Sequence, residues 1–233
     1  MAKKSQRIPV TRFVQDPAHC AVAAISSVSN FYDKSIDYDY VKEEAYAHDK
    51  RIKKEGMYTA DIGILLNKIG FNDATIITTD LDIFDYEWAK YSKVKLVDKL
   101  KRRVRSTKKG YVKNVTKGFL NFLNYSPRNK VIIDYQFGDY IREYLDSYRP
   151  LILSYNWTMF HRWEGTIKTG EEHHAVVCHG YNDEYAYITD SHVRHYTYRL
   201  SKYRNGKYKI KWEHLMTVMG AGDVILPGNF VGK

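Results

Sequence analysis

The chain has 233 residues, of which 44% are hydrophobic and 27% are charged, and its formal net charge is +10. A chain of this length buries roughly 70 to 75% of the surface that its unfolded form exposes, so we expect a single domain over residues 1–233. The chain has only two cysteines, which excludes a disulfide framework. It has no run of 18 apolar residues and no apolar run after its basic start, which excludes a membrane span and a secretory signal. We therefore expect a soluble, cytoplasmic protein.

The first third of the sequence is predicted to be largely helical, because apolar residues recur there at spacings of three and four. Glycines end two of these helices, and Thr59 is in a position to cap one of them. A short β-branched run flanked by threonine predicts a strand at the end of this third. The expected helices cover residues 20–32, 37–51 and 60–69, and the expected strand covers residues 74–78.

The next segment, residues 81–128, is basic. From Lys93 to Lys117 it holds eleven Lys or Arg residues and one acid, Asp98. Apolar residues at helical spacing predict one or two basic helices and then a loop that ends near Pro127, and we expect an insertion in the domain. Such a charge attracts an anionic partner, either a nucleic acid or an acidic protein, although a run of charge also suits a solvated helix face.

The last part of the sequence is predicted to be rich in strands, because apolar and aromatic residues alternate there with polar ones. Turn signals at Asn182-Asp183 and Asn205-Gly206 separate some of these strands. The expected strands cover residues 151–155, 174–181, 184–189, 195–200, 207–211 and 224–226, and the expected helices cover residues 137–148 and 212–219. Helices first and antiparallel strands later indicate an α+β fold.

Cys20 opens the first expected helix. Pro17 and the polar residues before it favour a loop, which delivers the thiol to the N-terminus of that helix. Unpaired N–H groups and the helix macrodipole stabilise a thiolate at such a position. A free cysteine is also a common small core residue, so a nucleophile needs in addition a histidine base and a group that orients this base.

His174 and Asp190 are the candidates for these two groups. They lie at the outer ends of the two strands of an expected hairpin, so their side chains would be neighbours. The Asp190 carboxylate would then stabilise the imidazolium, while the other ring nitrogen faces Cys20. Gln15, five residues before Cys20, would direct its side-chain amide at a developing oxyanion, together with the backbone N–H of Cys20.

The other histidines and the second cysteine carry different expectations. His173 alternates to the face opposite His174 and is expected at the surface, whereas Cys178 is expected in the core. The remaining histidines of this region lack the spacing of a zinc site; they are His179, His192 and His195. No glycine-rich phosphate loop opens a helix, so we expect neither a metal nor a cofactor.

These motifs resemble the papain-like cysteine peptidases. The motif residues follow one another along the chain in the same order as in that clan: Gln15, Cys20, His174-Ala175-Val176, Gly180-Tyr181 and Asp190. It is particularly similar to the bacterial branch around the bacteriocin double-glycine leader peptidases, whose helical region ends like Ile69-Gly70-Phe71. The likeness covers residues 13–33, 56–71 and 150–226 but not the basic segment 81–128.

The resemblance implies a papain-like α+β fold, in which the Cys20 helix packs on a C-terminal antiparallel sheet. It implies a peptide or protein substrate, whose amide bonds are hydrolysed through Cys20, His174, Asp190 and Gln15. The same groups can pass the acyl group to an amine, so an acyltransferase or transpeptidase is the near alternative. A second alternative is a binding protein that contacts nucleic acid or another anionic surface through residues 93–117.

Overall fold

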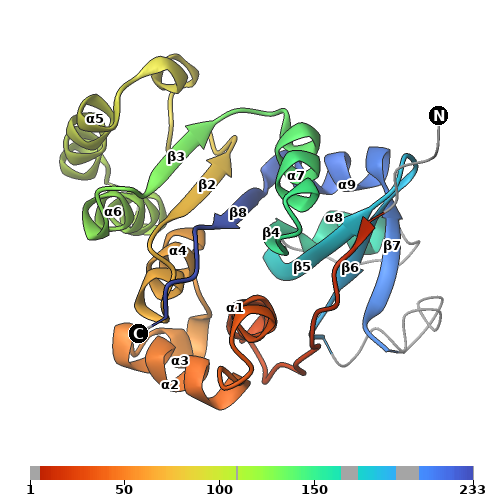
Figure 1. The fold of residues 1–233 in the computed structure, drawn as a ribbon. Helices are drawn as coiled ribbons and strands as arrows, with labels where there is room; N and C mark the ends of the chain where they lie inside the picture. Colours follow the sequence, from red (N-terminus) through yellow and green to blue (C-terminus); the bar gives the residue numbers. More distant parts are fainter. Residues whose placement is uncertain (1–5, 109, 164–172, 193–204, 233) are drawn as a thin grey trace.

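The structure is a computed structural model that describes residues 6–108, 110–163, 173–192 and 205–232. The described residues form an eight-stranded sheet with helices on both faces (Figure 1). The strands are β1 (Gln6–Arg7), β2 (Ala74–Thr78), β3 (Lys130–Ile133), β4 (Leu151–Asn156), β5 (His173–Tyr181), β6 (Tyr185–Thr189), β7 (Lys207–Lys211) and β8 (Asp223–Pro227). Their order is β3-β2-β8-β4-β5-β6-β7, and β1 pairs with β5.

The helices divide between the two faces of this sheet. In Figure 1, α1 and α4 lie below the sheet, and α7 and α9 lie above it. The helices are α1 (Cys20–Tyr32), α2 (Tyr38–His48), α3 (Ile52–Glu55), α4 (Thr59–Lys68), α5 (Lys93–Ser106), α6 (Gly110–Tyr125), α7 (Phe137–Asp146), α8 (Trp157–Trp163) and α9 (Trp212–Val218), with the 3-10 helices η1 (Tyr86–Lys90) and η3 (Met219–Ala221). Each helix among the described residues is too short or too polar to cross a bilayer.

The α+β prediction is confirmed, with helices in the N-terminal part and a mostly antiparallel sheet later in the chain. The sheet extends further than expected, because β2 and β3 join it as a parallel pair. β3 was not predicted from the sequence. A parallel pair needs a long crossover connection, and the basic segment with η1, α5 and α6 supplies it. The strand expected over residues 195–200 lies outside the described residues.

Helix ends in the first third follow local hydrogen bonds. The helix expected over 37–51 ends earlier, as α2 at His48, and a separate short helix, α3, follows and is ended by Gly56, which has φ +76°. The expected cap at Thr59 is wrong: the Asp61 carboxylate instead accepts the N–H of Tyr58, the residue before α4 (3.0 Å). The Thr59 hydroxyl donates to the Asp223 carboxylate at the start of β8 (2.5 Å), which ties α4 to the sheet.

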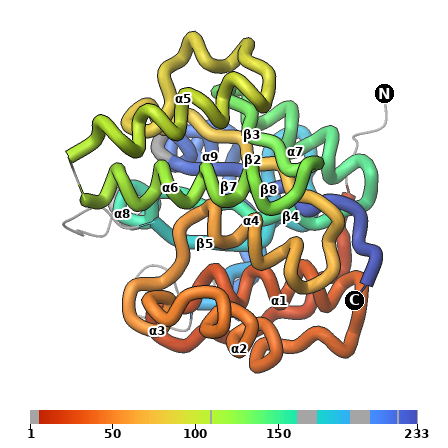
Figure 2. Tube along the Cα trace, turned by 90° about the vertical axis from the view of Figure 1, so that its left-hand side faces the viewer, coloured from red at the N-terminus to blue at the C-terminus, as the bar shows by residue number. Residues whose placement is uncertain are grey.

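The basic segment folds as two neighbouring helices, and part of its charge is used internally. Figure 2 shows α5 beside α6 over β3 and β2. The Lys93 ammonium group donates to three carbonyl groups of residues 126, 127 and 129, at 2.7 to 3.0 Å, and thereby joins the start of α5 to the end of α6. The Arg103 guanidinium donates to the Ile83 carbonyl (2.6 Å) and to the Asp85 carboxylate (3.0 Å). These two cations stabilise the segment itself.

The helix that carries Cys20 is held by its apolar face. Val22, Ile25 and Val28, which define the predicted face of α1, are fully buried against the core that includes β4 and β5. The Ser26 hydroxyl is buried too, and it donates to the Val22 carbonyl within the helix (2.8 Å). Burial of such side chains contributes about 1.5 to 3 kcal/mol each, so the position of the N-terminus of α1 relative to β5 is strongly determined.

Gly180 allows the first described strand to reach β5. A Cβ atom at this position would lie 2.2 Å from the backbone oxygen of Gln6, because β1 pairs with β5 at Arg7 and Gly180. The neighbouring register shift between Cys178 and Gly180 is a β-bulge, which sharpens the local twist. The glycine therefore permits a close backbone approach that any side chain would block.

We expect Gly180→Ala to lower the free energy of unfolding by about 1 to 3 kcal/mol, because the backbone of β1 has to move away from the new methyl group. Gly220→Ala is the matched control, since no atom lies within 4 Å of the corresponding Cβ position. Urea unfolding followed by circular dichroism gives both values. Equal stabilities of the two variants would show that β1 does not depend on the missing side chain.

Candidate active site

Cys20 is the first residue of α1, and it lies beside His174 of β5, which lowers the pKa of the Cys20 thiol. The loop before it turns sharply, with Ala18 in the left-handed region at φ 65°, and His19 forms the N-cap. Cys20 is partly exposed, whereas Cys178 is fully buried. The N-terminus of α1 thus places Cys20 beside β5, with part of the residue exposed.

His174 and Asp190 form a buried hydrogen bond between β5 and the end of β6. The distance from His174 Nε2 to Asp190 Oδ1 is 2.8 Å, and the exposed fractions of the two residues are 5% and 0%. Since Nε2 faces Asp190, Nδ1 is the ring nitrogen left to face Cys20. The structure therefore brings together the three residues Cys20, His174 and Asp190 in the order thiol, imidazole, carboxylate.

Electrostatics favour the charged forms of this group of residues. Burial opposes ionisation of Cys20, but the hydrogen bond to His174 and its positive charge outweigh burial and lower the pKa of the thiol. Burial would also lower the pKa of His174, but the charge of Asp190 and the hydrogen bonds to Asp190 and Cys20 raise it to about 10. These effects favour a thiolate–imidazolium pair over a neutral thiol and a neutral imidazole.

Asp190 receives hydrogen bonds from several directions. Its Oδ1 also accepts the backbone N–H of His192 (2.8 Å), and its Oδ2 accepts the hydroxyl of Tyr208 on β7 (3.1 Å). The Asp190 carbonyl accepts Nε of Arg12 (2.6 Å), and its N–H donates to the Gly206 carbonyl (2.7 Å). A fully buried carboxylate is costly unless it is hydrogen-bonded, and the contacts of Oδ1 and Oδ2 meet that requirement.

Aromatic rings cover the imidazole. The Trp157 ring, at the start of α8, lies 4.3 Å from the His174 ring between centroids, and it stacks on Phe160 with an interplanar angle of 5°. The Tyr155 ring meets the His174 ring edge-on at 6.1 Å. Trp157 is 4% exposed. Excluding water in this way strengthens the hydrogen bond between His174 and Asp190, because the local dielectric constant is low.

Gln15 is fixed near the end of β6. Its backbone N–H donates to the Ser191 carbonyl (3.1 Å), and its side-chain Oε1 accepts the Ser191 hydroxyl (2.8 Å). Its Nε2 makes a long contact of 3.5 Å with the Asp16 carbonyl. The hydrogen bonds of the described residues thus hold Gln15 beside the residue that follows Asp190, with its amide nitrogen only weakly engaged.

Several residues of this site were not identified from the sequence. Tyr208 had a usable signal, because the buried Tyr208 and Ile210 alternate with the exposed Lys207 and Lys209, as expected in a strand. Trp157 had none, since α8 follows β4 directly without a turn signal. Ser191 is an ordinary loop serine in the sequence, and only its contact with Gln15 distinguishes it.

The remaining sequence candidates lie apart from this group. His173 is exposed, and burial raises the pKa of Cys178 to about 12. His179 Nδ1 contacts the Ile8 carbonyl (3.0 Å), and burial lowers the pKa of His179 to about 4. Within the described part of the chain, no three His, Cys, Asp or Glu side chains gather closely enough to hold a metal ion. His195 is outside the described residues.

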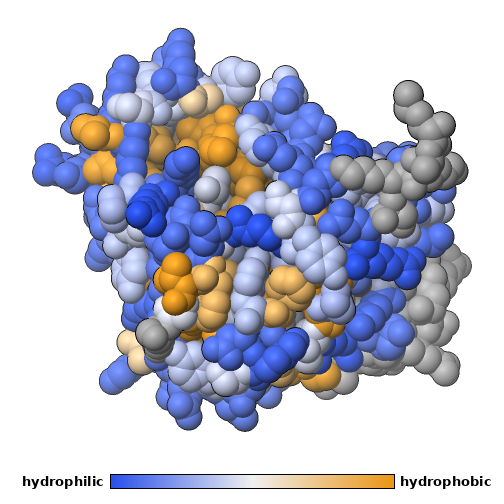
Figure 3. Space-filling model, in the orientation of Figure 1, coloured by the Kyte–Doolittle hydropathy of each residue, from blue (hydrophilic) through white to orange (hydrophobic). Residues whose placement is uncertain are grey.

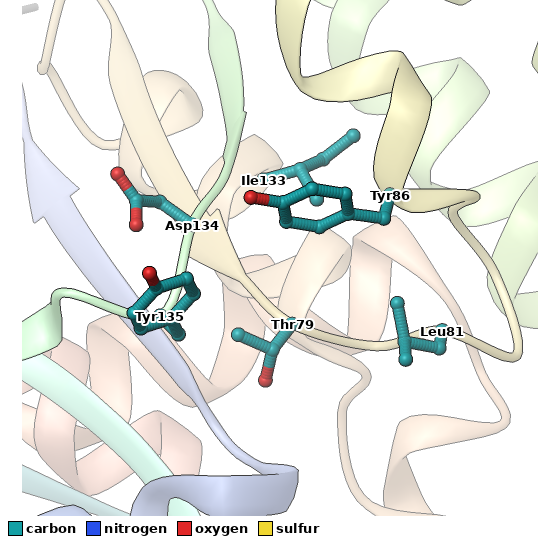
Figure 4. A pocket seen from close by; sticks show the side chains of 6 residues that line it. All are labelled: Thr79, Leu81, Tyr86, Ile133, Asp134 and Tyr135. Carbon is teal, nitrogen blue, oxygen red and sulfur yellow. The ribbon is translucent and has the colours of Figure 1, made fainter.

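A separate apolar pocket lies farther along the same end of the sheet. It has a volume of about 200 Å³, and Figure 4 shows Tyr86 and Tyr135 on two sides of it. Its other lining residues are Thr79, Leu81, Ile133 and Asp134. Figure 3 shows apolar side chains gathered in this region, between α5 and α7. Four strand spacings separate β3 from β5, roughly 19 Å, so the pocket is distant from His174.

We expect Cys20 to react with iodoacetamide well below pH 8.5, because His174 lowers the pKa of its thiol. The reactive thiolate forms as the pH rises through this lowered pKa. In His174→Ala the profile should move to higher pH, since the imidazolium is lost. Mass spectrometry of the alkylated peptides measures both, and buried Cys178 is the internal control. An unshifted profile in His174→Ala would contradict the proposed ion pair.

Comparison with known proteins agrees with this geometry. The chain matches the model of the Peptidase_C39 like family over residues 7–219, a range that includes Cys20, His174 and Asp190 as well as Gln15. No curated protein and no solved structure matches the chain. The resemblance to bacteriocin-processing peptidases is confirmed at the level of the family, and the basic segment lies inside the matched range. The chain belongs to the Peptidase_C39-like family, which is a family of cysteine peptidases.

Proposed function

We propose that the protein is a cysteine peptidase that hydrolyses peptide or amide bonds through Cys20, His174 and Asp190. The observation that carries this proposal is the buried His174, which is hydrogen-bonded to the Asp190 carboxylate (2.8 Å) and lowers the pKa of the Cys20 thiol. Nucleophile, base and orienting group are thus within contact of one another. Family membership supports the same reaction class. The substrate is accordingly a peptide or a protein.

The reaction follows from the charges of these residues. The Cys20 thiolate attacks the carbonyl carbon, and the carbonyl electron pair moves onto the oxygen to form a tetrahedral oxyanion. His174 then donates its proton to the leaving amine as the C–N bond breaks, which leaves a thioester on Cys20. Neutral His174 takes a proton from water, the hydroxide attacks the thioester, and the released thiolate restores the starting pair. Asp190 stabilises the imidazolium in both halves of the cycle.

We propose that the oxyanion is stabilised by the backbone N–H of Cys20 and by Nε2 of Gln15. The first residue of a helix has no intrahelical acceptor for its N–H, and the macrodipole favours negative charge there. The Ser191 hydroxyl holds Oε1 of Gln15, which leaves Nε2 as the end of the amide that can face a substrate. Such donors act most strongly on charge that develops in the transition state.

We also propose that the protein works in a reducing, cytoplasmic environment, because both cysteines are free and a low-pKa thiolate is the form most easily oxidised. An amine that reaches the thioester before water would give a new amide bond, and the enzyme would then be a transpeptidase. Product analysis separates these two outcomes.

We expect the purified protein to cleave members of a mixed peptide library and Cys20→Ala to abolish cleavage, since no thioester can form. Cys178→Ala is the matched control and should retain activity, because Cys178 is distant from the site. Gln15→Ala should reduce kcat by about 10²-fold, as expected for the loss of one oxyanion donor. Mass spectrometry identifies the products. Equal cleavage by Cys20→Ala and wild type would refute the proposal, and products with new amide bonds would indicate transpeptidation.

The basic segment is proposed as a second binding surface. Lys101, Arg102 and Arg105 are exposed on one side of α5, and Arg102 pairs with Asp98 (2.9 Å). Unlike Lys93 and Arg103, these three residues have no contacts within the described chain that hold α5 to the rest of the fold. Their charge suits an anionic partner, either a nucleic acid or an acidic protein.

We expect the triple substitution of Lys101, Arg102 and Arg105 by Gln to abolish salt-sensitive binding of the protein to heparin and to single-stranded nucleic acid, while peptide cleavage continues. The control variant replaces three other exposed lysines by Gln and removes the same net charge; they are Lys50, Lys54 and Lys130. Log affinity should fall linearly with log salt for wild type and control. Equal affinities of the two variants would show that overall charge, rather than the α5 surface, causes binding.

A further inference from the structure

Asp190 has to remain ionised while it is completely buried. Of its oxygens, Oδ1 faces His174 and the His192 N–H, and Oδ2 faces the Tyr208 hydroxyl. An ionised carboxylate only accepts hydrogen bonds, so Tyr208 has to donate its single proton to Oδ2. The orientation of this hydroxyl is therefore fixed by the charge of Asp190.

The hydrogen bond behind Tyr208 then has a direction as well. The hydroxyl oxygens of Tyr208 and Tyr155 are 2.8 Å apart, and either one is able to donate. Because the Tyr208 proton is used on Asp190, Tyr155 has to donate to Tyr208. Two hydroxyl dipoles thus point in sequence at the carboxylate, and each hydrogen bond polarises the next. Burial raises the pKa of Tyr208, as do the neighbouring Tyr155 and Asp190, so it stays protonated and remains a donor.

The two tyrosines come from strands on either side of the β5–β6 hairpin. Tyr155 lies on β4 and Tyr208 on β7, and the sheet order places β5 and β6 between them. Tyr155 pairs with His174 across β4 and β5. The hydroxyl pair therefore crosses the hairpin that carries the imidazole and ends on the oxygen of Asp190 that His174 does not use.

We propose that Tyr208, supported by Tyr155, is a positioning residue that keeps the Asp190 carboxylate ionised and oriented toward His174. This inference rests on the proposed cysteine peptidase function. Tyr208 acts through Asp190 and His174, so its hydroxyl sets how far the proton of Cys20 is transferred to the imidazole. Among the described residues, the polar groups that face this assembly include Cys20 from α1, His174 from β5, His192 after β6 and Arg12 from the N-terminal segment.

We expect Tyr208→Phe to narrow the pH range in which the protein cleaves peptides, and to move the rise of Cys20 alkylation to higher pH. Without the donor, the Asp190 anion is less stable and imidazolium formation is weaker. In the pH profile of cleavage, the acidic limb reports the Cys20 thiol and should move to higher pH. The basic limb reports His174 and should move to lower pH, each by about one pH unit. The loss in peptide cleavage should be about 10- to 100-fold and fall on kcat rather than KM. Alkylation and cleavage are both measured against pH.

Tyr181→Phe is the matched control, because the Tyr181 hydroxyl also donates to a carboxylate, but to that of Asp146 (2.5 Å) instead of Asp190. It should lose stability without a change in either pH limb. Tyr155→Phe should shift both limbs in the same direction as Tyr208→Phe but by less. If Tyr208→Phe does not fold, an unchanged pH range in Tyr155→Phe overturns the inference.

The outcomes separate this inference from the function on which it rests. A reactive Cys20 in wild type, with equal pH ranges in Tyr208→Phe and Tyr181→Phe, overturns the role of Tyr208 and leaves the peptidase proposal in place. An unreactive Cys20 in wild type overturns the peptidase proposal, and the role of Tyr208 with it. A narrowed range only in the variants of the hydroxyl pair supports the inference.

Discussion

The site depends on a carboxylate that is buried and charged at the same time. Asp190 has no exposed surface, so water cannot stabilise its charge, and every stabilising contact has to come from the chain. The same burial makes its field at His174 strong, because little solvent screens it. Other contacts of the region help to keep Asp190 buried and in place. The Arg12 side chain donates to the Asp190 carbonyl, and the Trp157 ring covers the imidazole of His174.

The sheet explains how residues distant in sequence arrive at one place. The start of β5 and the end of β6 lie side by side, so His174 and Asp190 come from the same end of a hairpin. The apolar face of α1 packs against β4 and β5, and this brings the helix N-terminus with Cys20 to that end. The basic segment supports the opposite part of the sheet, where it connects the parallel strands β2 and β3. The candidate active site and the basic segment are thus spatially separate.

Much of the site was predictable because it follows from local patterns. The spacing of Val22, Ile25 and Val28 predicted the helix that Cys20 opens, and strand alternation placed His174 and Cys178 on buried positions. The catalytic roles of Cys20, His174, Asp190 and Gln15 remain predictions, although the first three are in contact. The structure connects Gln15 to Ser191, a side-chain pairing over 176 residues that no local pattern encodes.

Most of the unpredicted parts share a physical cause. β3 is a short strand of four residues that went unpredicted although Val131, Ile132 and Ile133 are β-branched, and its pairing with β2 identifies it. Thr59 has the residue type of a helix cap, but a tertiary contact with Asp223 takes its hydroxyl. Tyr208 and Trp157 acquire their importance from neighbours on other strands and helices. Long-range contacts decided the roles of Thr59, Trp157 and Tyr208, and a local sequence pattern does not contain these contacts.

The contact between Arg12 and Asp190 also has a consequence for the newly made protein. The two residues are separated by 178 positions, so the ribosome completes the N-terminal helix long before His174 and Asp190 exist. At typical rates of synthesis the delay is on the order of 10 to 40 s. During this interval Cys20 has no imidazole to activate it and behaves as an ordinary thiol. For the nucleophile proposed here, the order of the residues along the chain therefore postpones activation of Cys20 by His174 until the last third has been translated and folded.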